Sequence, residues 1–357
     1  MTQLLHPVPS MGPRALALAI YAHPNGPAFD LPPAAESGYE GVACVDDGAR
    51  AALLYTEIWQ RHGFPWARDT AEGLLEFVLG MQLEDGAFVN FIGGWDGQPQ
   101  LTSPTSRPGG GPWQGRAMHA LARAVSVFGS ESYGAAFERG LDALSEPTPY
   151  LDMRALNAIA VLEYGQATGS ASANALALRW AESVAACRID DILPDIEGQT
   201  AIHLWGHLQE AALARIGASA GRDDLVRVAA RSADAILAPA AESAFTGARS
   251  LAFDVGSTVA GLDAVAVATG DSRYHELSMK ARAWFDGRNA AQQPVYERER
   301  GLVRDGIDGT MLNENSGAES NIEGALALID TVPWGGIHAS MGPGTPPSGT
   351  PRRVQRI

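Results

Sequence analysis

The chain has 357 residues, of which 46% are hydrophobic and 19% charged, enough apolar material for one large domain or two. Its formal net charge is −15 and its pI is near 4.9, and it has no basic block except Arg352-Arg353. Such a chain repels phosphate backbones, which argues against nucleic-acid binding and favours neutral or cationic ligands.

The cysteine content and the length of the apolar runs indicate the cellular compartment. Cys44 and Cys187 both lie among apolar residues, as reduced core thiols do, rather than in a disulfide framework. The apolar run at 15–22 is short, follows no basic region and has no clear cleavage site, and no run approaches the ~20 residues that span a bilayer. We therefore expect a cytoplasmic protein with no membrane partner.

The predicted elements are helical pairs that follow an irregular start. Residues 1–40 form an irregular N-terminal segment packed on the domain, with a short strand or helical turn at 16–21. Residues 41–335 form the main domain, and 336–357 a loose tail rich in Pro and Gly. The periodicity predicts helices at 46–62 with 67–82, 113–128 with 132–144, 152–167 with 171–188, 203–218 with 223–237, 256–268 with 273–289, and a last one at 316–329.

The two members of each pair differ in polarity. The first helices are rich in alanine and nearly apolar all round, as in 155–162 and 258–265, whereas the second helices carry charges on one face. Helices that are apolar all round are buried and amphipathic ones lie outside them. The pattern predicts an all-α fold, an (α/α)6 toroid of helical hairpins with inner and outer rings. Leu156, Ile159, Val259 and Leu326 should then be buried, and Lys280 and Arg282 exposed.

Two adjacent carboxylates, Asp46 and Asp47, stand where a loop becomes the first apolar helix. One aspartate is enough for a helix N-cap, so the second is a candidate for a perturbed pKa, because neighbouring like charges resist ionising together. Capping alone is the alternative interpretation of either aspartate. Glu319 has the same two interpretations, because Ser316 and Glu319 have the spacing of a capping box.

Polar and aromatic residues recur at the starts of the other inner helices. In a ring of parallel inner helices these starts meet at one mouth, walled by the loops 84–112 and 292–314. We predict Asp46, Asp47 and Glu319 as catalytic residues. The predicted substrate-binding residues are Asn90, Trp113, Arg116, His203, Trp205, His207, Asp254 and Tyr296.

The hairpins, the Asp-Asp-Gly helix start and the motif Trp113-Gln114-Gly115-Arg116 resemble the six-hairpin glycosidase superfamily. Unsaturated glucuronyl and rhamnogalacturonyl hydrolases are the nearest members, with an Asp-rich helix start and a Trp-Arg-Gly-type motif. The resemblance implies the toroid over most of 41–330 and glycoside hydrolysis. The mouth offers few cations besides Arg116 and Arg154, which disfavours uronate substrates.

A second resemblance lies in residues 202–210, which are similar to the His-bearing helix of the N-acylglucosamine and cellobiose 2-epimerases. Those enzymes need a second His-bearing helix start, whereas here only His275 and His338 follow, away from inner-helix starts. Sugar epimerisation or isomerisation is therefore the second hypothesis. A non-catalytic carbohydrate-binding toroid, with its carboxylates acting only as caps and ion pairs, is the third.

His203, His207 and Glu210 would share one face of a helix and could in principle hold a metal. The spacing lacks the Glu of His-Glu-x-x-His, and structural zinc favours cysteines, so we expect neither metal nor cofactor. The sequence favours a glycoside hydrolase in which one protonated and one ionised carboxyl act on a small-molecule or oligosaccharide substrate. It does not specify the oligomeric state.

Overall fold

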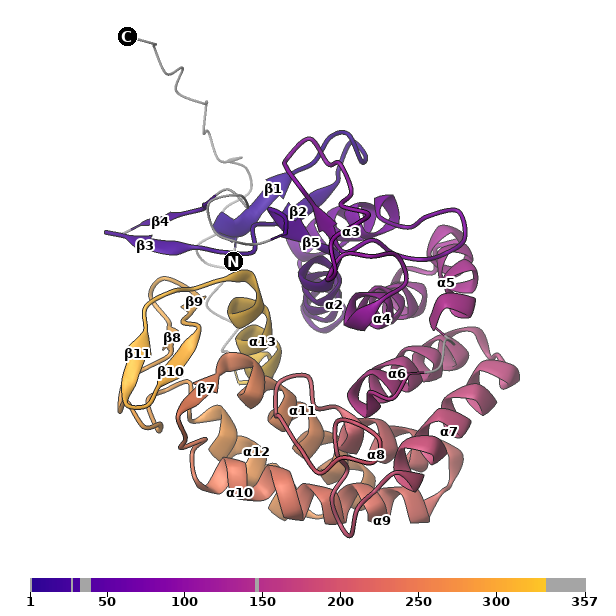
Figure 1. The fold of residues 1–357 in the computed structure, drawn as a ribbon, viewed down its shortest axis with the longest axis vertical. Coiled ribbons are helices and arrows are strands. Elements are labelled where there is room, and N and C mark those ends of the chain that lie inside the picture. The colour runs from indigo at the N-terminus through magenta and orange to yellow at the C-terminus, as the bar shows by residue number, and fades with distance from the viewer. Residues whose placement is uncertain (1, 27, 33–39, 145–147, 332–357) are drawn as a thin grey trace.

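The computed structural model describes residues 2–26, 28–32, 40–144 and 148–331. Within them, six helices form an inner ring in the order α2, α4, α6, α8, α11 and α13, and α13 packs back against α2 (Figure 1). Their bounds are α2 Val45–His62, α4 Gly111–Phe128, α6 Leu151–Thr168, α8 Gln209–Ala220, α11 Ala252–Thr269 and α13 Ala318–Leu328. The ring is closed, and the predicted toroid is confirmed. The predicted tail 336–357 lies outside the described residues.

The outer helices lie around this ring. They are α3 (Pro65–Gly80), α5 (Glu131–Leu144), α7 (Ala171–Ala186), α9 (Asp223–Ser232), α10 (Ala238–Glu242) and α12 (Ser272–Arg282), and a π-helical segment, Ala233–Leu237, joins α9 to α10. Five inner helices, α2, α4, α6, α8 and α11, end at a glycine with left-handed backbone, such as Gly169 with φ 70°. This conformation suits glycine and ends each helix abruptly before the chain turns toward an outer helix.

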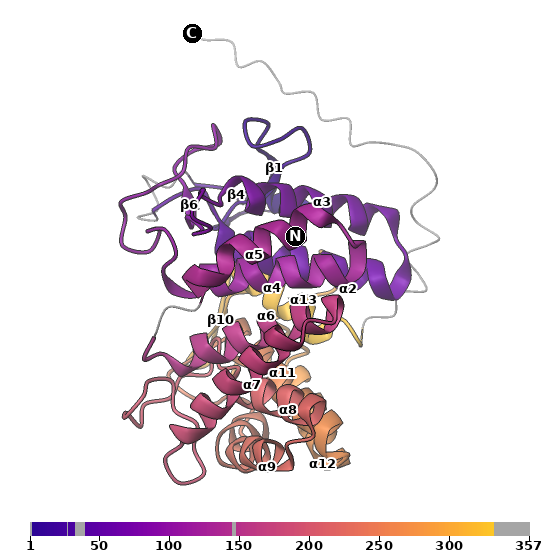
Figure 2. The same ribbon diagram turned by 90° about the vertical axis from the view of Figure 1, so that its right-hand side faces the viewer.

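Short antiparallel strands connect the hairpins, and they and the long loops gather on one side of the ring (Figure 2). A first turn at Thr2–Leu4 leads into the hairpin β1 (Leu5–Pro7) and β2 (Leu16–Leu18), and β3 (His23–Asn25) pairs with β4 (Ala28–Asp30). β5 (Ala43–Cys44) pairs with β6 (Phe91–Ile92), and β8 (Tyr296–Glu297) with β9 (Leu302–Val303). A three-stranded sheet has the order β11 (Met311–Asn313), β10 (Gly306–Asp308), β7 (Arg249–Leu251).

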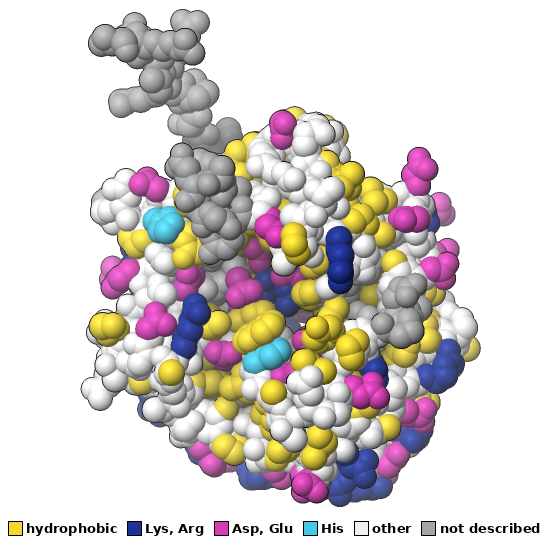
Figure 3. Space-filling view, viewed as in Figure 1, with side chains coloured by type: hydrophobic (Ala, Val, Ile, Leu, Met, Phe, Trp, Pro, Cys, Tyr) yellow, Lys and Arg dark blue, Asp and Glu magenta, His cyan; other side chains and the backbone are white. Residues whose placement is uncertain are grey.

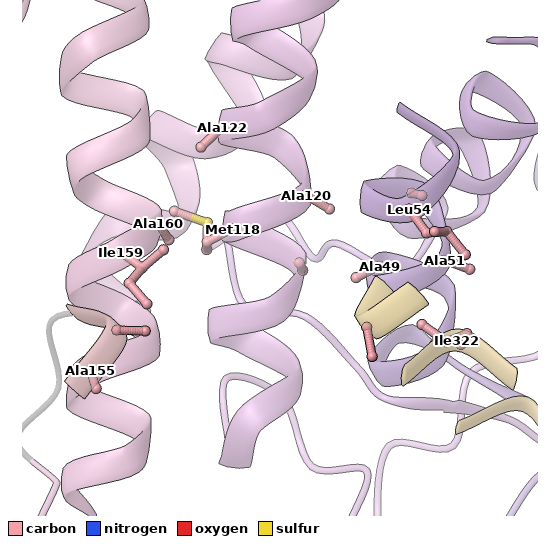
Figure 4. Close-up of a cluster of buried hydrophobic side chains, with 14 of the residues drawn as sticks. Ala49, Ala51, Leu54, Met118, Ala120, Ala122, Ala155, Ile159, Ala160 and Ile322 are labelled. Atoms are coloured by element: carbon pink, nitrogen blue, oxygen red, sulfur yellow. The ribbon is translucent and has the colours of Figure 1, made fainter. Parts of the chain in front are cut away.

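Small side chains let the inner helices approach one another. Figure 4 shows alanines of α2, α4 and α6 between the helices, with larger chains such as Leu54, Met118 and Ile159 filling the space around them. All three of these larger chains are at most 2% exposed. Close-packed contacts of this kind are the main source of stability in a helical domain.

Four sequence predictions about helix starts were wrong. The helix expected from residue 256 begins at Ala252. The helix expected from residue 203 begins at Gln209, so 203–208 is a loop. Asp46 and Asp47 lie in the first turn of α2, whose N-cap is Cys44. The capping box at Ser316 is absent from this described segment, because α13 is capped by Gly317 without a side-chain bond and Ser316 donates to the Val303 carbonyl instead.

The burial predictions hold with two exceptions. Leu156, Ile159 and Val259 are buried and Lys280 is exposed, as expected. Leu326 is only partly buried, because its helix face borders an open cavity. Arg282 is buried, contrary to expectation, and its guanidinium bonds Asp263 of the neighbouring inner helix at 2.6 Å. A charge pattern on one helix does not reveal a carboxylate on the next.

One helix among the described residues, α11, is long and apolar enough to cross a membrane by length and composition. A buried core helix passes the same test, and α11 is an inner helix of the ring with more than half of that stretch buried.

Candidate active site

The start of α2 is held by the loop beneath it. The Asn90 side chain accepts from the amide of Asp46 at 3.0 Å, and the amide of Asp47 donates to Cys44 Sγ at 3.4 Å. Two otherwise unpaired amides of the first helical turn are thereby satisfied. Asn90 itself is buried, so its role is to position Asp46.

Arg50 is the centre of the site. Its buried guanidinium donates to Asp47 and to Glu323 at 2.7 Å each, to Asp46 at 3.2 Å and to Glu319 at 3.3 Å. Asp46 and Asp47 come from the first inner helix, and Glu319 and Glu323 come from the last. One cation thus gathers four carboxylates from the two ends of the chain, an arrangement suited to the planar, multidentate guanidinium.

The carboxylates of this cluster differ in exposure. The Asp47 side chain is 6% exposed, that of Asp46 16% and that of Glu319 45%. Burial raises the pKa of Asp47 to about 6, although Arg50 opposes the shift. Burial likewise raises the pKa of Glu323, against the effect of Arg50. The cluster therefore combines buried carboxyls whose pKa is raised with more accessible ones.

Arg116 joins the same cluster from α4. Its guanidinium bonds Asp46, and its carbon lies 5.3 Å from the ring centroid of Phe253, which also lies 4.8 Å from the Arg50 guanidinium carbon. The second oxygen of Asp46, Oδ1, is buried and has no protein partner. An unpartnered buried oxygen beside two guanidiniums is where a donor from a ligand could bind.

A cavity of about 960 Å³ runs along the inner faces of the ring, and Figure 3 shows the hollow in this face of the molecule, where acidic, basic and apolar side chains meet. The wall of the cavity includes three residues of the carboxylate cluster, namely Arg50, Arg116 and Glu323. Within the described part of the chain, Asp46, Asp47 and Glu319 do not line it. With Glu319 almost half exposed, the cluster forms the rim of the hollow and the cavity extends below it.

Known structures share this arrangement of helices. A D-mannose isomerase matches with a TM-score of 0.66 and 11% identity, over 91% of this chain and 94% of that one. A sugar epimerase from a ruminal bacterium matches with a TM-score of 0.62 and 12% identity, over 81% and 87%. An α-1,6-mannanase of glycoside hydrolase family 76 from Salegentibacter sp. matches with a TM-score of 0.57 and 12% identity, over 80% and 88%.

The fold is the (α/α) toroid of these sugar-processing enzymes. At such low identity the likeness establishes the fold alone. No family model matches the chain, and no curated protein is similar to it in sequence.

Besides Arg116, three predicted substrate contacts at the mouth of the toroid line the cavity together: Trp113, His203 and Trp205. Trp113 is anchored by donating to the Phe88 carbonyl at 3.0 Å. His203 stacks on Trp205 with ring centroids 3.7 Å apart, and Trp205 is 46% exposed. An exposed indole backed by a second ring offers a rigid apolar face of the kind that packs against a sugar ring.

The remaining predicted contacts of the toroid lie elsewhere. His207 is fully buried between Asp195 at 2.9 Å and Glu210 at 3.0 Å, and it does not reach the cavity. Asp254 accepts from the Leu251 amide at 2.7 Å and so caps α11. Tyr296 lies in β8 beside Arg298 and, among the described residues, is not part of the cavity wall.

Several site residues of the toroid were not predicted from the sequence. Arg50 and Glu323 lie one turn along their helices from Asp46 and Glu319, so the i, i+4 spacing was the available signal. Asp152, in the first turn of α6, was not among the predicted site residues, yet it lines the cavity with a buried, unpartnered Oδ1, and burial raises its pKa.

Among the residues that the structure describes, the carboxylate cluster is the group that could hold a metal ion. Oxygens of Asp46, Asp47 and Glu319 lie within 4.8 Å of one another. Arg50 and Arg116 already bond these groups and neutralise much of their charge, which weakens the site as a metal centre.

Proposed function

We propose that the chain is a carbohydrate-processing enzyme that hydrolyses glycosides at the carboxylates of α2 and α13. The observation that carries the proposal is the cluster itself, in which carboxylate oxygens of Asp46, Asp47 and Glu319 lie within 4.8 Å of one another at the mouth of a large cavity. Paired carboxyls flanking the scissile bond are the common machinery of glycoside hydrolysis.

We assign the roles of the carboxylates from their exposure and their hydrogen bonds. Asp46 accepts hydrogen bonds from Arg50 and Arg116, which orient its carboxylate, so it is assigned as the nucleophile toward the anomeric carbon. Glu319 is the most exposed member and is assigned as the acid that protonates the leaving oxygen and later deprotonates the attacking water. The short separation resembles the ~5 Å spacing of retaining enzymes.

Asp47 lies behind this pair, bonded by Arg50 and by the Cys44 thiol at 3.3 Å. With its pKa near 6 it changes protonation state close to neutral pH and alters the charge that Asp46 feels. The α-1,6-mannanase of similar fold is described as inactive when two consecutive aspartates are replaced by asparagine. Asp46 and Asp47 are such a pair here.

A second candidate function is sugar isomerisation or epimerisation, which the isomerase and epimerase of similar fold favour. His203 would be the base, because it lines the mouth with its Nδ1 bonded to the Trp205 carbonyl at 2.8 Å. Its Nε2 then remains for proton transfer, at 3.6 Å from Asp195. His207, fixed in its buried ion pair, is unsuited to that role.

The test is incubation of α-1,6-mannobiose and of D-mannose with the enzyme in deuterated water, followed by NMR. Hydrolysis yields new reducing ends without carbon-bound deuterium, and it should fall at least ~10²-fold in Asp46→Asn and in Glu319→Gln. The matched control, Asp308→Asn at an exposed carboxylate, should retain full activity. Deuterium on the carbon beside the carbonyl, lost in His203→Gln, would establish the isomerase instead.

A further inference from the structure

The inner faces of the toroid are layered from the mouth downward. Along α2 the cavity wall runs from Arg50 through Leu53 to Glu57, so a cation is followed by an apolar side chain and then by a carboxylate. Along α13 and the turn that follows it, the wall runs from Glu323 through Leu326 to Asp330, so an apolar side chain lies between two carboxylates. Because both stripes have helical spacing, one apolar level lies between two charged levels.

The other inner helices contribute to the same level. We call it the apolar belt, and its members are Leu53, Leu156, Ile159, Ala211, Ala260 and Leu326. Two polar residues, His119 of α4 and Asn157 of α6, lie among these described wall residues. His119 is bonded to Glu163 at 3.0 Å, and Asn157 donates to the Leu144 carbonyl at 3.2 Å. The belt therefore offers little hydrogen bonding to a hydroxyl-rich sugar.

Three members of the belt border open space, whereas Leu156, Ile159 and Ala211 are buried. Ala260 lies midway along an inner helix and yet is exposed, and Leu53 and Leu326 are only partly buried. On the outer face of α11, the helix that carries Ala260, the side chains of Leu262 and Val265 are completely buried. The unfilled volume thus lies on the axis of the ring, where alanines stand in place of larger residues.

The chemistry of this space defines its ligand. Water in an apolar cavity lacks hydrogen-bond partners, and such cavities readily take apolar molecules. Burial of apolar surface is favourable by about 25 cal/mol per Å². The same cavity continues to the rim, where Trp205 and the carboxylate cluster offer contacts for a sugar. A molecule with an apolar part in the belt and a sugar at the polar rim would match both surfaces.

We propose that the apolar belt binds the hydrocarbon aglycone of a glycoside whose sugar lies at the carboxylate cluster. The identity of the apolar part as an aglycone rests on the proposed hydrolase function; the apolar site itself rests on the cavity alone. The belt has a lower limit, because Arg61 pairs with Asp330, and Arg282 with Asp263, at the far end of the cavity. From Arg50 to Glu57 is about 10 Å along α2, which limits the useful chain length.

The experiment is calorimetric titration with n-alkyl β-D-glucopyranosides from methyl to decyl, each below its micelle concentration. Each methylene that enters the belt should tighten binding about fourfold. The gain should end once the chain reaches the charged floor. Equal affinity for the methyl and octyl compounds would overturn the proposal.

Matched variants locate the site. Ala260→Phe fills the belt and should weaken octyl glucoside binding at least tenfold, with methyl glucoside binding unchanged. Val267→Phe, on the same helix but 85% exposed and outside the described cavity wall, should bind like the parent. If Ala260→Phe does not fold, Ala260→Asp places a charge in the same wall and should weaken octyl binding equally. Equal binding by the position-260 and position-267 variants would refute the belt as the site.

One further variant separates the two proposals. Asp46→Asn should lose hydrolysis but keep the dependence of affinity on chain length. If no glycoside is hydrolysed by the parent enzyme while octyl binding still depends on Ala260, the hydrolase proposal fails and the apolar site stands. If hydrolysis occurs at equal rates for methyl and octyl glucosides and affinity does not depend on chain length, the hydrolase proposal stands and the apolar site fails.

Discussion

Arg116 of α4 lies over Phe253 of α11, the inner helix opposite it in the ring, with 5.3 Å between the guanidinium carbon and the ring centroid. Arg50 approaches the same ring to 4.8 Å from α2. One aromatic side chain thus supports both cations that hold Asp46, and this contact crosses the hollow of the toroid at the level of the carboxylates.

Phe253→Leu should therefore lower activity more than stability. Leucine keeps most of the apolar burial but removes the cation–π attraction, worth about 1 kcal/mol. The two guanidiniums then lose a common support, and we expect kcat to fall about tenfold. Phe245→Leu, a buried phenylalanine packed on Trp284 away from the site, is the control. Unchanged kcat in Phe253→Leu would show that the ring does not position the arginines.

Arg50→Lys should be strongly destabilising. An ammonium group cannot bond four carboxylates in four directions, so at least one buried carboxylate loses its partner, at a cost of roughly 3–5 kcal/mol. Chemical denaturation measures the loss. Arg61→Lys, at a far more exposed ion pair on the same helix, should cost less than about 1 kcal/mol. Similar losses for both variants would contradict the central role of Arg50.

Because of Asp47, the free energy of unfolding should fall as the pH rises. Its pKa is about 6 in the folded protein against an ordinary 3.8, so the unfolded chain releases this proton first. The contribution is fully present below pH 3.8 and is lost by about pH 6, which amounts to roughly 3 kcal/mol. Because Asp47→Asn cannot ionise, its stability relative to the parent should rise by that amount between pH 4 and pH 7. A difference in stability that does not change with pH would refute the assignment.

His207 has the opposite pH dependence. Burial lowers its pKa, but Glu210 and Asp195 outweigh burial and raise it to about 10. Its ion pairs therefore stabilise the fold fully below pH 6.5, and this stabilisation is lost as pH rises through 10. His207→Gln should cost roughly 3–5 kcal/mol at pH 6 and much less at pH 10. Exposed His275→Gln is the control, and a cost for His207→Gln that is independent of pH would contradict the charged pair.

The ring could be predicted because local composition defines it. An inner helix such as α6 must be apolar all round, and its alanines record how closely neighbouring helices approach. The loop 203–208 could not be recognised, because Leu204 and Leu208 continue the helical spacing and only Gly206, with φ 72°, breaks it. A single glycine within an apolar pattern is weak evidence for a loop.

The site was harder to predict than the fold. Asp46, Trp113 and Arg116 were found because they begin helices. The cluster as a whole depends on which helix starts face each other across the ring, and one-dimensional spacing does not contain that information. The burial of Asp47 and of His207, and hence their pKa shifts, also arises from tertiary packing.

The bond between Arg50 and Glu323 joins residues 273 positions apart in the chain. Contacts between such distant residues form late in folding, since the entropy of closing so long a loop must be overcome first. The first inner helices can pack on their neighbours long before α13 closes the ring. We therefore expect the carboxylate cluster to be assembled at the end of folding, so that a chain whose ring has not yet closed has its helices but not this cluster.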